Sequence, residues 1–181
     1  MTEIDFFAND LLEEAKRFLE KSGDSSDTVA QKANLHAALM LSFCALEAHL
    51  NAIGEEFSSQ TALSPHEKGI LLERDVRLDD GEYRLSKSLK ITRLEDRIDF
   101  LHRKFSGTPP DRSSTTWRGR LAEAIDLRNK LTHAREVPLI SEASVQRALQ
   151  AIVDTLDALY KAIYNRSFPA ASRGLTSRLT F

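Results

Sequence analysis

One segment constrains the fold of this chain more than any other. Residues 33–54 are apolar on nearly every side of a helix and carry a single charged side chain, Glu47. A helix that is apolar all round has to be covered on most of its faces, so we predict that this segment is the central helix of a bundle. Its longest apolar run, residues 37–46, is about half as long as the ~20 residues that a membrane-spanning helix needs. We therefore expect no membrane-spanning segment.

Further segments with apolar residues at helical spacing can supply that cover. They lie at residues 4–20, 65–73, 88–105, 115–135 and 141–164. Only 7 glycines and 5 prolines occur in 181 residues, which favours long helices over many short strands. Residues 76–85 instead alternate between apolar and polar side chains around an Asp-Gly pair, a pattern that is typical of a β-hairpin. We predict an all-α, up-and-down bundle of four to five helices, with a small hairpin or loop inserted between the second and fourth helical segments.

The chain shows no internal repeat and no domain boundary, so we predict one domain. It spans residues 1–165, with the insertion at about 60–87, and a basic tail follows at 166–181. The tail has no helical period and is either disordered or packed on the body. Cys44 is the only cysteine, which excludes an intrachain disulfide and fits a reducing compartment. Because the N-terminus also lacks the features of a signal peptide, we expect a cytoplasmic protein, with Cys44 buried and inert.

Charge is distributed unevenly along the chain. The net charge is −2, which gives no overall attraction for nucleic acid. Residues 112–135, however, carry six basic and two acidic side chains, and the tail carries arginines and no acid. An anionic ligand is therefore expected near one of these two segments. The mixed charges within residues 93–103 suggest a solvated helix face with ion pairs one turn apart.

Arg128 stands where an apolar residue is expected. The helical segment at 115–135 has an apolar stripe, and Arg128 falls in its middle. On the central helix, Glu47 is the corresponding outlier of opposite sign. A buried carboxylate needs a partner, so we predict a buried Glu47–Arg128 ion pair that fixes the register of the two helices.

His133 lies one helical turn after Asn129, in the last turn expected before Pro138. The negative end of the helix dipole favours a protonated imidazole there. Arg128, Asn129 and His133 together offer a fixed positive charge, an amide and a group that exchanges a proton near neutral pH. Such a set suits a phosphodiester, because arginine binds phosphate oxygens in a planar fork and histidine acts as base or acid.

Two short motifs resemble those of the HEPN superfamily. Residues 128–133 read RNKLTH and residues 46–51 read LEAHLN, and the similarity extends over residues 4–164 apart from the insertion. The resemblance implies an all-α protein that dimerises so that two arginine–histidine motifs share one cleft. It also implies a metal-independent RNA endonuclease without a cofactor, acting as a toxin or defence effector, with a nucleotidyltransferase-type antitoxin as a further partner.

The resemblance also assigns roles to individual residues. Arg128, Asn129 and His133 would be catalytic, and the second-helix residues Glu47 and Asn51 would support them from behind. The neighbouring cations would contact RNA; these are Lys130 and Arg135.

Other interpretations stay open. The chain would instead be a non-catalytic HEPN-like interaction or RNA-binding module if Arg128 only joins two helices and His133 only ends one. A nucleic-acid-binding regulator is less favoured, because no recognition-helix motif appears. The remaining histidines lack metal-ligand spacing, so we expect no metal site; these are His36, His49, His66 and His102.

Overall fold

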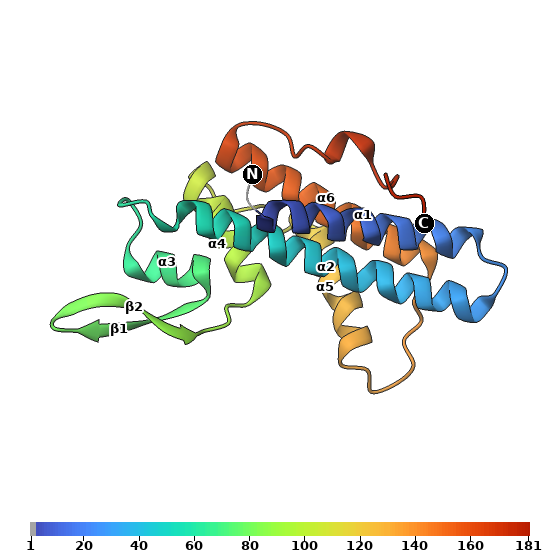
Figure 1. Cartoon of the computed structure of the whole chain (residues 1–181), viewed down its shortest axis with the longest axis horizontal. Helices are drawn as coiled ribbons and strands as arrows, with labels where there is room; N and C mark the ends of the chain where they lie inside the picture. Colours follow the sequence, from blue (N-terminus) through green and yellow to red (C-terminus); the bar gives the residue numbers. More distant parts are fainter. Residues whose placement is uncertain (1–2) are drawn as a thin grey trace.

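The computed structural model describes residues 3–181, which form six α-helices and one antiparallel two-stranded hairpin (Figure 1). The helices are α1 (Glu3–Asp24), α2 (Thr28–Ser58), α3 (Pro65–Leu72), α4 (Leu94–Ser106), α5 (Trp117–Thr132) and α6 (Glu142–Tyr164). The strands are β1 (Arg74–Asp79) and β2 (Glu82–Leu89), and a 3-10 turn covers Ala171–Arg173. A mostly helical fold with an inserted hairpin is thus confirmed. Residues 1 and 2, part of the predicted domain, lie outside the described residues.

Several predicted boundaries are wrong, and two of them have a clear structural reason. α2 continues past Gly54 to Ser58, because a glycine inside a well-packed helix weakens it without ending it. The fourth helix begins at Leu94 and not at residue 88, since the chain up to Leu89 still pairs with β1.

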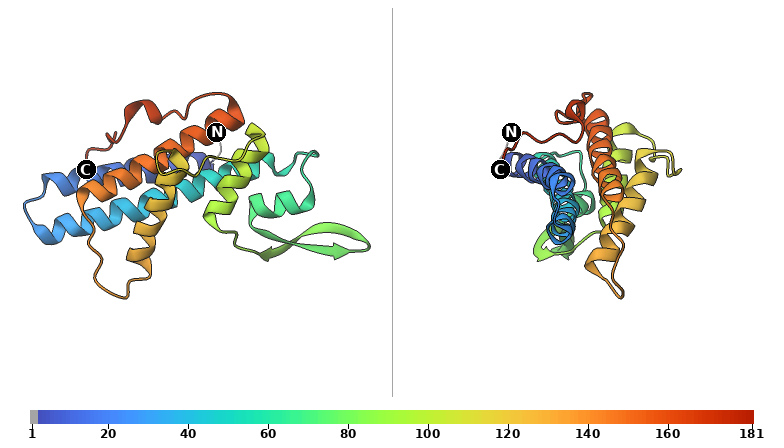
Figure 2. Two further views of the ribbon diagram at one scale, coloured as in Figure 1. Left: turned by 180° about the vertical axis from the view of Figure 1, so that it is seen from behind. Right: turned by 90° about the vertical axis from the view of Figure 1, so that its right-hand side faces the viewer.

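The core lies where α2 meets α1 and α6, and α4 and α5 pack on α6 (Figure 2). Asp27 caps α2 by accepting a hydrogen bond from the backbone N–H of Val29. Within residues 3–181, α2 is the one helix long and apolar enough to cross a membrane. In the most apolar stretch of α2, which is 18 residues long, 67% of the residues are buried inside the bundle, as expected for a core helix.

Arg97 of α4 anchors the α3–hairpin unit to the body. Its buried guanidinium donates to the Asn51 side chain at 2.8 Å and to the backbone carbonyls of Leu50 and Leu71. Gly54 allows this approach, because a Cβ there would lie 2.6 Å from the Leu71 carbonyl oxygen. The prediction of a solvated face around residues 93–103 is therefore wrong for Arg97.

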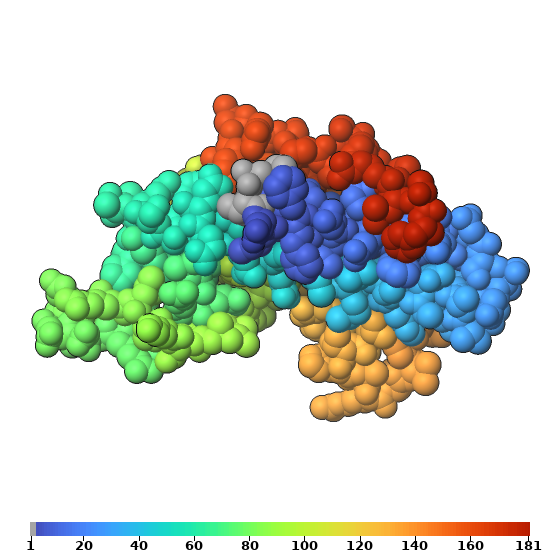
Figure 3. Space-filling view, viewed as in Figure 1, coloured from blue at the N-terminus to red at the C-terminus, as the bar shows by residue number. Residues whose placement is uncertain are grey.

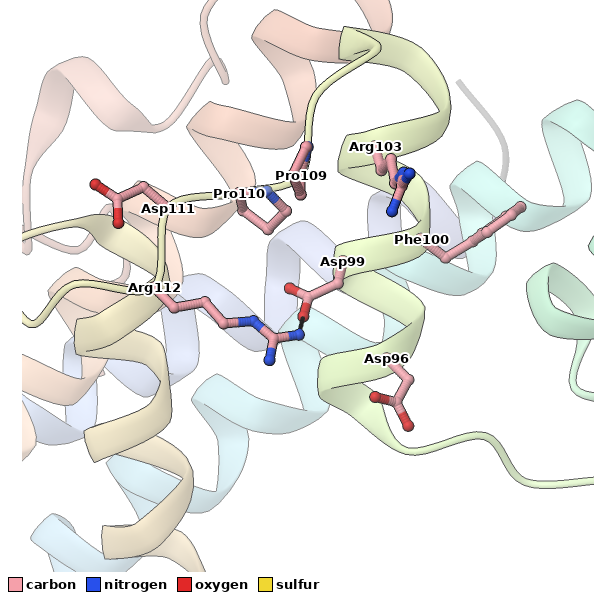
Figure 4. A pocket seen from close by; sticks show the side chains of 8 residues that line it. All are labelled: Asp96, Asp99, Phe100, Arg103, Pro109, Pro110, Asp111 and Arg112. Carbon is pink, nitrogen blue, oxygen red and sulfur yellow. Dashed lines mark hydrogen bonds and ion pairs between the residues drawn. The ribbon is translucent and has the colours of Figure 1, made fainter.

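The start of α5 is tied to α4 by a second buried arginine. Arg118 donates to Asp99 at 2.6 Å and to Glu95 at 3.0 Å. Figure 4 shows Arg112 reaching from the preceding loop to the same Asp99, across a hollow of about 590 Å³. The first half of α5 is therefore held firmly, which fixes the direction in which its second half leaves the bundle.

The tail packs along α1 (Figures 1 and 2). The carboxylate of Glu13 accepts hydrogen bonds from the Arg173 side chain at 2.8 Å and from the Arg178 backbone N–H at 2.7 Å. Phe168 is buried against the ring of His49. Of the two alternatives left open, packing is correct, and two tail arginines, Arg173 and Arg178, form ion pairs with Glu13.

Candidate functional site

The candidate motif lies where α5 leaves the bundle. The first half of the helix is anchored by buried Leu121, Ala124 and Ile125, whereas residues 132–137 are all exposed. Figure 1 shows the end of α5 and the loop after it protruding beyond α2. Arg128 and Asn129 therefore stand at the edge of the core, and His133 stands outside it.

Arg128 bridges α5 and α2. Its Nη1 lies 3.5 Å from Oε1 of Glu47, and its guanidinium lies 5.0 Å from the centre of the Phe43 ring. Its Nε and Nη2 also donate to Oδ1 of Asn129, at 3.3 and 3.1 Å. The guanidinium is held from three sides, and since arginine has five N–H groups, donors remain for a ligand. Sequence reasoning missed Phe43, whose position one turn before Glu47 was the available signal.

The Glu47–Arg128 pair is confirmed, but the prediction that it is buried is wrong. The Arg128 side chain is 24% exposed and that of Glu47 is 51% exposed. The reason is that no other element of the described chain covers this strip of α2, on which Cys44 is also exposed. The prediction of a buried thiol is therefore wrong. Partial burial and the nearby Glu47 carboxylate raise the pKa of Cys44, which keeps the thiol protonated at neutral pH.

His133 is the residue that ends α5. Its backbone N–H donates to the Asn129 carbonyl at 2.9 Å, and its own φ and ψ of −122° and 36° are no longer helical. The helix is thus shorter than the predicted end at residue 135. The imidazole is exposed and makes no hydrogen bond or ring contact with any residue in 3–181, so both ring nitrogens are open to a ligand. Asn129 links the two candidates, through its side chain to Arg128 and through its carbonyl to His133.

Unpaired positive charge is concentrated beside His133. Arg112, Arg118 and Arg120 all form ion pairs with acids of neighbouring helices. Lys130 and Arg135, in contrast, form no ion pair within the described chain and line an open hollow of about 890 Å³ with His133. Of the basic segment, the cations without an ion pair are at its C-terminal end.

Asn51 lies on the same helix as Glu47 but is bonded elsewhere. Its Oδ1 accepts the hydrogen bond from Arg97, and no hydrogen bond between Asn51 and Arg128 occurs in the structure. The side chain therefore belongs to the anchor of the hairpin unit.

The surface is hollowed between the hairpin and the protruding end of α5, with α2 between them (Figure 3). Exposed apolar side chains occur at the end of the hairpin and in the loop after α5. Leu89, the last residue of β2, is 71% exposed and Ile91, just after it, is 78% exposed; Val137 and Leu139, after α5, are 91% and 98% exposed.

Among residues 3–181, no three His, Cys, Asp or Glu side chains are grouped so that they could hold a metal ion. Comparisons with protein-family models, with curated proteins and with solved structures found no match.

Proposed function

We propose that this protein is a metal-independent RNA endonuclease of the HEPN type and that it acts as a homodimer. The observation that supports this most directly is the arrangement at the end of α5. There the Arg128 guanidinium is fixed at the surface by Glu47, Phe43 and Asn129. An exposed histidine without a partner follows in the next turn of the same chain.

The chemistry follows from these groups. The 2′-hydroxyl oxygen of the RNA attacks the adjacent phosphorus, and the bond from phosphorus to the 5′-oxygen breaks, which leaves a 2′,3′-cyclic phosphate. His133 takes the proton of the attacking hydroxyl or gives one to the leaving oxygen. Arg128 binds the non-bridging oxygens, whose charge grows in the transition state.

A dimer solves a geometric problem. On a straight helix, residues five positions apart point about 140° apart, and His133, which has already left the helical conformation, makes no hydrogen bond with Arg128. A two-fold axis can bring Arg128 of one subunit beside His133 of the other. The uncovered strip of α2 and the apolar side chains of Val137 and Leu139 supply a surface for that contact.

The test is incubation of pure protein with RNA in EDTA. Wild type is expected to cleave, and His133→Ala and Arg128→Ala are expected to lose cleavage while remaining folded. The matched controls are His66→Ala, an exposed histidine on α3, and Arg103→Ala, an exposed arginine on α4. Absence of cleavage by wild type, or equal loss in the controls, would contradict the proposal.

Mixing the two inactive variants tests the shared cleft. If Arg128 and His133 act across the two-fold axis, a heterodimer contains one intact site, and random mixing restores about a quarter of wild-type activity. If each subunit carries a complete site, mixing restores nothing. Labelling of Cys44 by a thiol reagent gives a second measurement, because a dimer that covers α2 slows labelling as protein concentration rises.

The second candidate is a non-catalytic HEPN-like module that binds RNA or another protein. The exposure of Val137 and Leu139 directly after the motif favours it. It predicts that His133→Ala leaves binding and any cellular effect unchanged. As a toxin, the active protein should stop growth when expressed alone, and a nucleotidyltransferase-type antitoxin should relieve this.

A further inference from the structure

A further hollow lies between α5 and α6, which pack side by side (Figure 2). Its volume is about 440 Å³, and Ala124, Leu127 and Ala148 contribute its apolar side chains. Three cationic side chains also line it, namely Arg120, Lys130 and Arg147. We call this hollow the α5–α6 groove.

The charges of the groove are largely available. The side chains of Lys130 and Arg147 form no ion pair or hydrogen bond within residues 3–181, and both are exposed. Arg120 is paired with Asp154 at 3.4 Å, but its side chain is 53% exposed. Glu123 is the acid that lines the groove, so the lining carries net positive charge. Such a surface attracts an anion in a protein whose overall charge is negative.

The groove leads to the candidate site. Lys130 lines both the groove and the hollow that contains His133 and Arg135. Arg120 and Lys130 are ten residues apart on one helix, which corresponds to about 15 Å along its axis. The two hollows thus adjoin at Lys130, and together they are long enough for a strand of a few nucleotides.

We propose that the α5–α6 groove binds the sugar–phosphate backbone of single-stranded RNA and leads the strand to His133; its role in delivering substrate rests on the proposed nuclease function. The lining residues include no aromatic side chain, so base stacking is not available there. Binding should accordingly be governed by phosphate contacts, tolerate different base sequences and weaken steeply with salt. An extended RNA strand is favoured over an acidic peptide, because the groove adjoins, at Lys130, the site that suits a phosphodiester.

The experiment measures binding of a fluorescent single-stranded RNA by anisotropy, in a His133→Ala background that keeps the RNA intact. Arg147→Glu and Lys130→Glu are each expected to weaken binding by about ten-fold or more and to lower the salt slope by about 0.7. Glu123→Gln should strengthen binding, because it removes the negative charge of the groove. Lys87→Glu, on exposed β2 and free of ion pairs, is the matched charge control and should have little effect.

The outcomes separate this inference from the nuclease proposal. If RNA is cleaved but groove variants bind it like the parent, the groove inference fails and the nuclease stands. If RNA binds through the groove but is never cleaved, the nuclease proposal fails and the groove stands. Equal weakening by Lys87→Glu, or binding of a polyglutamate peptide in place of RNA, would overturn the groove as an RNA site. Circular dichroism of each variant shows that the helices are retained.

Discussion

Replacing Arg128 with alanine separates the structural contribution of this side chain from a catalytic one. Its ion pair with Glu47 spans 3.5 Å and is half exposed, and such pairs contribute about 0.5 kcal/mol. The guanidinium over Phe43, 5.0 Å from the ring centre, adds about 0.5–1 kcal/mol. The expected loss of unfolding free energy is therefore about 1–1.5 kcal/mol, or roughly 2–6 °C in Tm for a chain of this length.

The catalytic effect should be much larger. A group that binds the growing charge of a transition state contributes about 10²–10³-fold in rate, equivalent to about 3–4 kcal/mol. Single-turnover cleavage at 25 °C, with the folded fraction measured by urea unfolding, compares the two effects in one preparation. Arg128→Lys keeps the charge and loses the planar fork, so it should retain more stability than activity. Glu47→Gln should lower stability by about 0.5 kcal/mol.

A catalytic role of Arg128 is refuted if the rate of Arg128→Ala, corrected for the folded fraction, equals that of wild type. The expected loss of stability is wrong if Arg128→Ala loses more than about 3 kcal/mol of unfolding free energy, because the half-exposed contacts of Arg128 do not account for such a loss.

Three further predictions concern buried polar groups. Arg97→Met should lower the unfolding free energy, measured in urea, by about 3 kcal/mol, because two buried carbonyls lose their hydrogen-bond donor. The rate of amide hydrogen exchange should rise most in α3 and the hairpin. Burial lowers the pKa of His49 to about 4, so the unfolded chain binds a proton more readily than the folded one, and the unfolding free energy should fall by up to ~3 kcal/mol as pH drops from about 6.5 to 4. Thermal melts of His49→Phe should lack this decline, and an unchanged decline would exclude His49 as its source. The Nζ of Lys16 is fully buried without a hydrogen bond and lies 3.7 Å from Glu13. The unfolding free energy of Lys16→Met, measured in urea, should therefore match or exceed that of wild type, and a loss above ~2 kcal/mol would contradict this.

The elements could be predicted because their signals are local. Ser141 caps α6 by accepting from the Ser144 N–H, at the residue where the sequence places the start of that helix. The hairpin turns at Asp80 and Gly81, whose φ angles of 49° and 81° are those that an Asp-Gly pair adopts most readily. In both places, a few consecutive residues determine the backbone.

Burial could not be predicted in the same way, because it depends on elements distant in sequence. Arg97 stands in a run of alternating charges and does not differ in residue type from Arg93 or Arg103. It is buried because α3 returns and places the Leu71 carbonyl against it. Lys16 likewise lies on an ordinary amphipathic helix and is buried because the tail folds back over it and pairs with Glu13.

At the candidate site, the pairing of Glu47 with Arg128 could be predicted from the sequence, but the exposure of the pair could not. Periodicity alone placed Glu47 and Arg128 on facing sides of two helices, which needs only two elements. Their burial needs a third element over the outer strip of α2, and the described chain supplies none there. An apolar helix with one side uncovered is most simply completed by a second subunit, in which case the pair would become buried only in the dimer. The same contact would then complete the core and assemble the proposed cleft, so loss of the dimer should reduce stability and cleavage together.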